Sequence, residues 1–108
     1  MSKEELSKAI GQRLELVRLA LDYPTQTAFA AALNREIPMT PQRWNNYVCA
    51  RDRLTLDVAL AMCRRFPVTL DWIFRGDAST LRSDIARKIE ELTERRGAAA
   101  STRANRNL

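Results

Sequence analysis

Apolar residues recur at steps of three and four at the start of the chain, which is the period of a helix that packs on one side. Ser2 and Glu5 precede the repeat in the Ser-x-x-Glu order of a capping box. Pro24 ends it, because the residue before a proline disfavours helical geometry. The pattern predicts a long amphipathic helix that ends near Asp22, with an apolar face of Leu6, Ile10, Leu14, Val17 and Leu21.

Capping residues and further apolar repeats predict more helices along the chain. Thr25 and Thr40 each precede a helical pattern, and Thr55 or Asp57 precedes another. Pro41 fits the first position of a helix, where no amide donor is needed. We therefore expect short helices over residues 26–33, 41–48 and 56–66, followed by one over 69–76 that Gly76 ends.

The connections between these helices carry predictions of their own. Asn34 is expected to end the second helix in the left-handed conformation. The following residues cross to Thr40, and Ile37 or Met39 is expected to fill the core between the two helices. The helix after Thr55 offers an apolar set for packing, which consists of Leu56, Ala59, Leu60, Met62 and Cys63.

The segment 40–48 has two different faces when it is wound as a helix. At about 100° per residue, Trp44, Tyr47 and Val48 share one side. Gln42 and Asn46 lie opposite, and Arg43 and Asn45 lie on the flanks. Arg pairs bidentately with guanine, and Asn or Gln with adenine, in the DNA major groove. The segment therefore fits either an ordinary surface helix or one that reads DNA bases.

The last part of the chain has a narrow apolar stripe. Leu81, Ile85, Ile89 and Leu92 follow one another at steps of four, four and three in a helix predicted to run from Asp77 to about Arg96. Such a stripe either packs on the domain or pairs with a second chain. Residues 97–108 have few groups to bury and are predicted to be a flexible tail.

Composition narrows the classes of function. The 108 residues include 18 basic and 13 acidic side chains, a net charge of +5, which permits a nucleic-acid partner. The chain has no histidine, two cysteines and three glycines, so it has no usual general base, no common zinc set and no Gly-rich phosphate loop. We expect no enzyme activity, no metal and no cofactor. We also expect a cytoplasmic protein without a membrane span.

Three segments, taken together, resemble the Cro/C1-type (XRE-like) helix-turn-helix family. Residues 25–30 (TQTAFA) are similar to the family's opening of its second helix, Thr/Ser-Gln-x-x-Leu-Ala. Residues 39–47 (MTPQRWNNY) are similar to its recognition segment. Residues 68–76 (VTLDWIFRG) resemble its closing Val-Ser-x-Asp-Trp-Leu-x-x-Gly, so that the resemblance covers about residues 8–76.

The resemblance implies an all-α, five-helix lambda-repressor-like domain over residues 1–76, followed by the C-terminal helix 77–96. It also implies that a dimer binds duplex DNA at a palindromic operator and regulates transcription. Two departures stand out: the turn after Asn34 is longer than the family's, and Cys49-Ala50 replace its Glu-x-Gly. By position, the implied base-reading residues are Gln42, Arg43, Asn46 and the flanking Asn45, and the phosphate-binding residues are Gln26, Thr40, Arg51 and Arg53.

Two functions are therefore open, and they are compatible. The first is a sequence-specific transcriptional regulator that binds double-stranded DNA as a homodimer. The alternative is a protein-interaction module, such as an antitoxin whose C-terminal helix covers a partner protein. In both, the dimer or partner face is predicted to be the stripe of Leu81, Ile85, Ile89 and Leu92.

Overall fold

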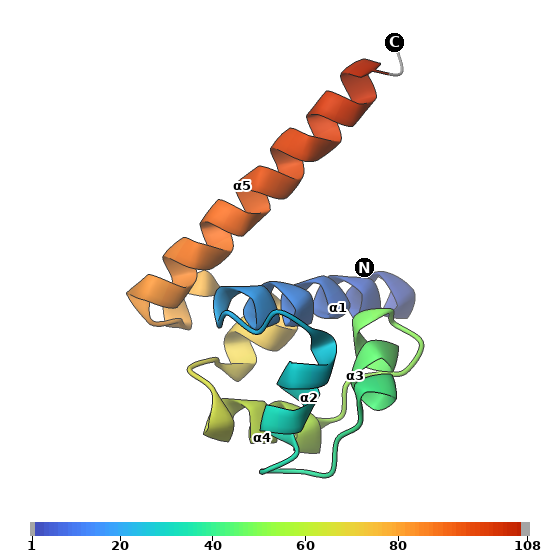
Figure 1. The fold of residues 1–108 in the computed structure, drawn as a ribbon, viewed down its shortest axis with the longest axis vertical. Coiled ribbons are helices and arrows are strands. Elements are labelled where there is room, and N and C mark those ends of the chain that lie inside the picture. The colour runs from blue at the N-terminus through green and yellow to red at the C-terminus, as the bar shows by residue number, and fades with distance from the viewer. Residues whose placement is uncertain (1, 107–108) are drawn as a thin grey trace.

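The chain is all-α in the computed structural model, which describes the backbone of residues 2–106 and the side chains of residues 2–97. Over this range it contains no β-strand. Figure 1 shows α1 lying across the body, α2, α3 and α4 on one side of it, and α5 rising away on the other. The elements are α1 (Lys3–Ala20), α2 (Gln26–Leu33), α3 (Pro41–Val48), α4 (Leu56–Arg65), the π-turn η1 (Asp71–Arg75), the 3₁₀ turn η2 (Ala78–Thr80) and α5 (Ser83–Arg106).

Hydroxyl side chains start the first four helices, as the sequence predicts. Ser2, Thr25, Thr40 and Thr55 each accept a hydrogen bond from the backbone amide three residues ahead, at 3.1–3.3 Å. Each bond satisfies one of the amides that has no partner inside its own helix. The predicted stop at Gly76 is also confirmed, since Gly76 takes the left-handed conformation with φ of 73°.

Aromatic side chains from separate elements form the centre of the core. Phe29 of α2 stacks on Phe66 with ring centroids 4.6 Å apart, and it meets Trp44 of α3 at the same distance. Tyr23 packs edge-on against Phe29 at 5.3 Å. Trp44 and Phe29 are fully buried, together with Leu14 of α1. Burial of these side chains holds α2 and α3 against α1 through the hydrophobic effect.

The α1 and α3 backbones touch at Gly11. A Cβ atom at this position would collide with the carbonyl oxygen of Val48 and lie 3.0 Å from its carbonyl carbon. Glycine inside a helix costs about 0.5–1 kcal/mol relative to alanine. Gly11 is not part of the predicted apolar face, although a glycine on the apolar side of a helix between Ile10 and Leu14 is a signal of close backbone approach.

The predicted apolar stripe, which begins at Leu81 just before α5, packs on the body of the same chain. Leu81, Ile85 and Ile89 are at least nine-tenths buried, and Leu92 is half-buried. Lys88 adds an ion pair with Asp22 at 2.8 Å. The stripe thus takes the first of its two predicted alternatives, because its side chains reach the core beside α1. In the single chain, three of the four residues are therefore covered, and Leu92 keeps part of its surface exposed.

The bounds of α5 also differ from the sequence prediction. Asp77 caps the turn η2 by accepting a hydrogen bond from the amide of Ser79 at 3.0 Å, and α5 itself begins at Ser83. The helix continues beyond Arg96 to Arg106, through part of the segment predicted to be a tail. Alanine has the highest helix propensity, so residues 98–100 favour continuation of the helix past Gly97.

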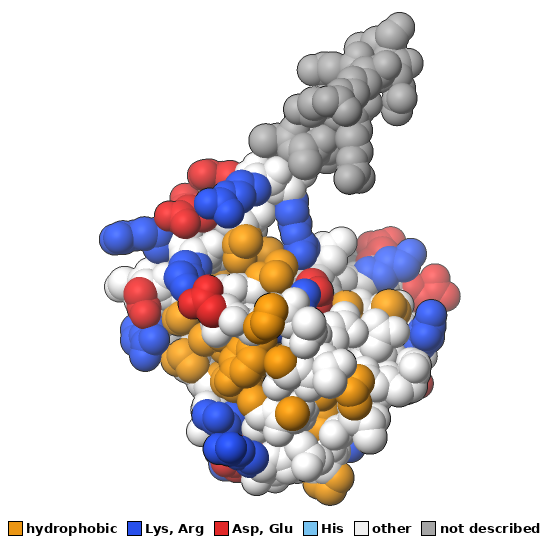
Figure 2. All heavy atoms as spheres, in the orientation of Figure 1, with side chains coloured by type: hydrophobic (Ala, Val, Ile, Leu, Met, Phe, Trp, Pro, Cys, Tyr) orange, Lys and Arg blue, Asp and Glu red, His pale blue; other side chains and the backbone are white. Residues whose placement is uncertain are grey.

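Helix α4 buries only part of its predicted apolar set, since Ala59 and Met62 are fully buried and Cys63 packs against the core, but Leu56 and Leu60 are exposed. Leu56 is 58% exposed and Leu60 is 38% exposed, whereas Val58 and Ala61 are fully buried. Seven of the ten residues of α4 are apolar, so its periodicity does not define one face, and contact with the core selects the Val58 side. Figure 2 shows other hydrophobic side chains reaching the surface over the middle of the body, with charged side chains around them.

Candidate nucleic-acid interface

Helix α3 buries one face and exposes the other. Trp44 is fully buried and Tyr47 is 5% exposed, so both anchor the helix to the core. Gln42 is exposed on the opposite side, and Asn45 and Asn46 are half-buried. The structure therefore brings three of the predicted base-reading amides together on one short helix whose orientation is set by two large aromatic anchors.

The amides on this face are partly ordered before any ligand binds. Gln42 Nε2 donates to Asn46 Oδ1 at 2.9 Å, one turn along the helix. On the flank, the thiol of Cys49 donates a weak hydrogen bond to Asn45 Oδ1 at 3.5 Å. The bond between Gln42 and Asn46 leaves the Gln42 oxygen as an acceptor and the Asn46 nitrogen as a donor. One acceptor and one donor side by side match the edge that adenine presents in the major groove.

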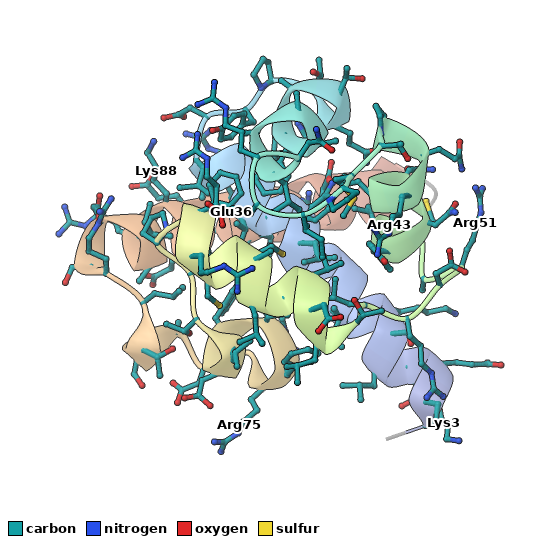
Figure 3. The ribbon with its side chains drawn as sticks, turned by 90° about the horizontal axis from the view of Figure 1, so that it is seen from below. Lys3, Glu36, Arg43, Arg51, Arg75 and Lys88 are labelled. Carbon is teal, nitrogen blue, oxygen red and sulfur yellow. The ribbon has the colours of Figure 1, made fainter. Side chains whose placement is uncertain are left out.

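Arg43 folds back onto its own chain. Its Nε donates to the hydroxyl of Tyr47 at 3.0 Å, and its Nη1 donates to the carbonyl of Pro38 at 2.6 Å. Figure 3 shows Arg43 against α3 with Arg51 further out on the same side. In this arrangement Arg43 connects α3 to the preceding turn through two of its five N–H groups, and the other three have no hydrogen-bond partner among the described residues.

The long turn between α2 and α3 has a defined shape. Asn34 is right-handed, with φ of −61°, so the predicted left-handed helix end is wrong. Its side chain closes the turn instead, because Oδ1 accepts a hydrogen bond from the amide of Met39 at 2.8 Å. Met39 is 6% exposed, and Ile37 is half-buried beside the core. Both residues that were expected to fill the space between the two helices therefore pack there. Glu36 also reaches Arg64 of α4 at 3.4 Å.

The loop after α3 carries two exposed arginines, Arg51 and Arg53. The carbonyl of Asn46 accepts hydrogen bonds from the amides of Arg51 at 2.9 Å and Asp52 at 3.2 Å, which fixes the start of this loop. Ala50 adopts the left-handed conformation with φ of 59°. The loop therefore keeps a conformation suited to glycine even though the residue there is alanine.

The other two predicted phosphate contacts lie at helix starts. Gln26 is half-buried in the first turn of α2. Thr40 is exposed, and its Oγ1 is occupied as acceptor by the amide of Arg43 at 3.1 Å, which leaves its hydroxyl proton free for a second partner. Amides at helix starts favour anions, so both positions fit a phosphate.

The described residues show no metal-binding cluster and a Cys63 thiol of low reactivity. In the part of the chain that the structure describes, no group of three His, Cys, Asp or Glu side chains is placed to hold a metal. Burial raises the pKa of the half-buried Cys63 thiol, which makes it a weak nucleophile. None of the helices among the described residues is long and apolar enough to cross a membrane.

Comparisons of the chain with protein-family models, curated proteins and solved structures found no match. The resemblance to the Cro/C1-type family therefore depends on the sequence motifs alone, and the inference of function depends on the geometry of α3 and its surroundings.

Proposed function

We propose that the protein is a sequence-specific regulator of transcription that inserts α3 into the major groove of duplex DNA. The observation that carries the proposal is the division of α3 into two faces. Trp44 and Tyr47 fix it to the core, while Gln42 and Asn46 form a hydrogen-bonded amide pair on the outer side. The order of elements in residues 1–76, with α2 and α3 joined by a turn and the motif ending at Gly76, fits a lambda-repressor-like domain.

The proposal assigns different roles to the polar residues. Gln42 and Asn46 read bases, and Asn45 contacts the groove from the flank. Arg51 and Arg53 bind phosphates after the helix, and Gln26 and Thr40 bind phosphates before it. Arg43 holds the turn in its free state through two of its N–H groups, and the remaining three are the ones that would contact a guanine.

A homodimer on a two-fold-related site is part of the proposal, because a single short helix contacts only a few base pairs. Its interface has to lie outside the stripe that packs on α1. The same burial weakens the antitoxin alternative, because α5 would have to leave α1 before the stripe could cover a partner protein. The proposed activity includes no catalytic step.

Selection of random duplex DNA on the purified protein tests the proposal. We expect enrichment of a palindromic sequence, and loss of that preference when both Gln42 and Asn46 are replaced by Ala. Each correct base contact contributes about 1–3 kcal/mol of discrimination, so the double variant should lose roughly tenfold or more in the ratio of specific to random binding. Salt-dependent binding without any enrichment would contradict the proposal.

The phosphate contacts need a separate measurement. Arg51→Ala should weaken binding to all sequences alike and lower the slope of log K against log salt by about one. Arg75→Ala is the matched control, since this exposed arginine lies on η1, away from α3 in Figure 3. Equal losses in the two variants would show that Arg51 contributes only to net charge.

A further inference from the structure

Two adjoining hollows lie between the start of α1 and the loop after α3. The first has a volume of about 180 Å³ and is lined mainly by apolar side chains, those of Leu6, Ile10, Leu54 and Phe74, with Tyr47 of α3 beside them. The second, of about 350 Å³, is more polar. Lys3, Ser7, Asp52 and Arg53 line both hollows, so the two are continuous.

The size of the apolar hollow fits one small ring. A cavity of about 150 Å³ lined by aliphatic and aromatic side chains holds benzene in another protein. Leu6 borders this hollow and is 41% exposed, although its neighbours on the same face of α1 are buried. A bound ring would cover the exposed part of Leu6, which gives the ligand a hydrophobic driving force.

The polar hollow has an excess of positive charge. Four cations, Lys3, Lys8, Arg51 and Arg53, face two carboxylates, Glu4 and Asp52. Among the described residues, none of the four cations takes part in an ion pair or a side-chain hydrogen bond with protein. Figure 3 places Lys3 and Arg51 on the same side of the molecule. A cationic hollow continuous with an apolar one suits a ligand with an anionic head and a small apolar body.

We infer that these hollows bind a small aromatic carboxylate, with the ring against Leu6, Leu54 and Phe74 and the carboxylate between Lys3 and Arg53. The ligand would contact the loop that carries both proposed phosphate-binding arginines. It would therefore act as an effector that lowers affinity for DNA, a consequence that rests on the proposed function. Binding of the ligand itself does not depend on DNA.

Phenylacetate is a suitable probe, and chemical-shift titration of the full chain without DNA is the direct measurement. We expect saturable shifts at residues around Leu6, Tyr47 and Leu54. Phenylacetamide has the same shape without the charge. Its affinity should be lower by about tenfold or more, because a charge-assisted hydrogen bond contributes more than a neutral one. Acetate lacks the ring and should not compete.

Two variants separate the site from general charge effects. Leu6→Glu places a carboxylate at the border of the apolar hollow and should abolish phenylacetate binding. Leu60→Glu is the control, because Leu60 has nearly the same exposure, 38% against 41%, but lies on α4 and lines neither hollow. Equal binding of phenylacetamide, competition by acetate, or no difference between the two variants would overturn the inference.

A DNA titration at saturating phenylacetate then tests the regulatory consequence. We expect the apparent affinity of the protein for DNA to fall, and the fall to disappear in Leu6→Glu. Phenylacetate binding with unchanged DNA affinity would contradict the effector role and leave the ligand site in place. No DNA binding at all would count against the proposed function. The chemical-shift titration would still show whether phenylacetate binds in the hollows.

Discussion

Helices α3 and α5 are both amphipathic and both bury their apolar stripe in the same core, yet their outer faces differ. The outer face of α3 carries the neutral amides of Gln42 and Asn46, bonded to each other. The outer face of α5 mixes acidic and basic side chains, such as the exposed Arg87, Glu90 and Glu94. Amides in a fixed pattern can discriminate among bases, whereas a mixed-charge face is well solvated and specifies little. The comparison teaches that the face opposite the stripe, more than the stripe, indicates where this molecule binds a partner.

The two helices also differ in how they are held. Backbone contact at Gly11, the cap at Thr40 and the bonds of Arg43 fix α3 along its whole length. Contacts near its beginning hold α5, and the helix then continues away from the body (Figure 1). A base-reading helix has to keep a fixed position relative to its phosphate contacts, and α3 meets that requirement.

The largest effect is expected from Ile89→Ala in the stripe of α5. Removing a buried isoleucine side chain beyond Cβ should lower the free energy of unfolding by about 2–5 kcal/mol. Urea denaturation at two protein concentrations measures this loss. Because the stripe packs within one chain, the loss caused by Ile89→Ala should be the same at both concentrations. A strong dependence that Ile89→Ala removes would show that the stripe joins two chains instead.

A pair of glycine substitutions compares the two helices directly. Gly11→Ala should destabilise the protein by about 1–3 kcal/mol, because the new methyl group forces α1 and α3 apart. Gly97→Ala should stabilise it by up to about 1 kcal/mol, because nothing lies within 4 Å of the new atom in α5. Thermal denaturation followed by circular dichroism measures both. A stable Gly11→Ala protein with unchanged DNA binding would show that the close contact is unimportant.

The left-handed residue after α3 gives a smaller effect. Ala50→Gly should raise the free energy of unfolding by about 1 kcal/mol, since the left-handed conformation costs roughly 1–2 kcal/mol for a residue with a Cβ. Asp22→Gly, at the end of α1 beside α5, is the control. Asp22 has φ of 64° but tolerates it better and pairs with Lys88, so its replacement should gain less. A greater gain at Asp22 would contradict this explanation.

The smallest expected effect concerns pH at the start of α5. A hydrogen bond from Arg82 lowers the pKa of Asp84. Stability from this pair is therefore present above the unfolded pKa of about 4 and is lost as pH falls through the lower folded value. Asp84→Asn should destabilise the protein slightly at pH 7, and the difference should vanish at a pH low enough to protonate the carboxyl group in both the folded and the unfolded state. Residues 41–48 contain no acidic side chain, so α3 makes no such contribution.

Much of the fold can be predicted from local signals. Thr25, Thr40 and Thr55 start helices because each hydroxyl accepts a hydrogen bond from the amide three residues further along the chain. Pro41 supports the start at Thr40, because proline is tolerated in the first turn of a helix and disrupts the interior. The two faces of α3 also follow from the sequence. Trp44 and Tyr47 are three residues apart and lie on one side of the helix, where their large apolar rings are buried, and Gln42 lies on the opposite side. The conformation of Asn34 could not be predicted, because its side chain bonds to Met39 across the turn.

The sequence by itself determined the starts of the first four helices and the polar face of α3, because these depend on neighbours within one or two turns. The tertiary structure decided which side of α4 is buried, where the stripe of α5 packs, and that Arg43 holds the turn. It also decided the close contact at Gly11 and the hollow beside Leu6. Each of these depends on atoms brought together from distant parts of the chain. The periodicity of one segment contains no information about which distant residues it will contact.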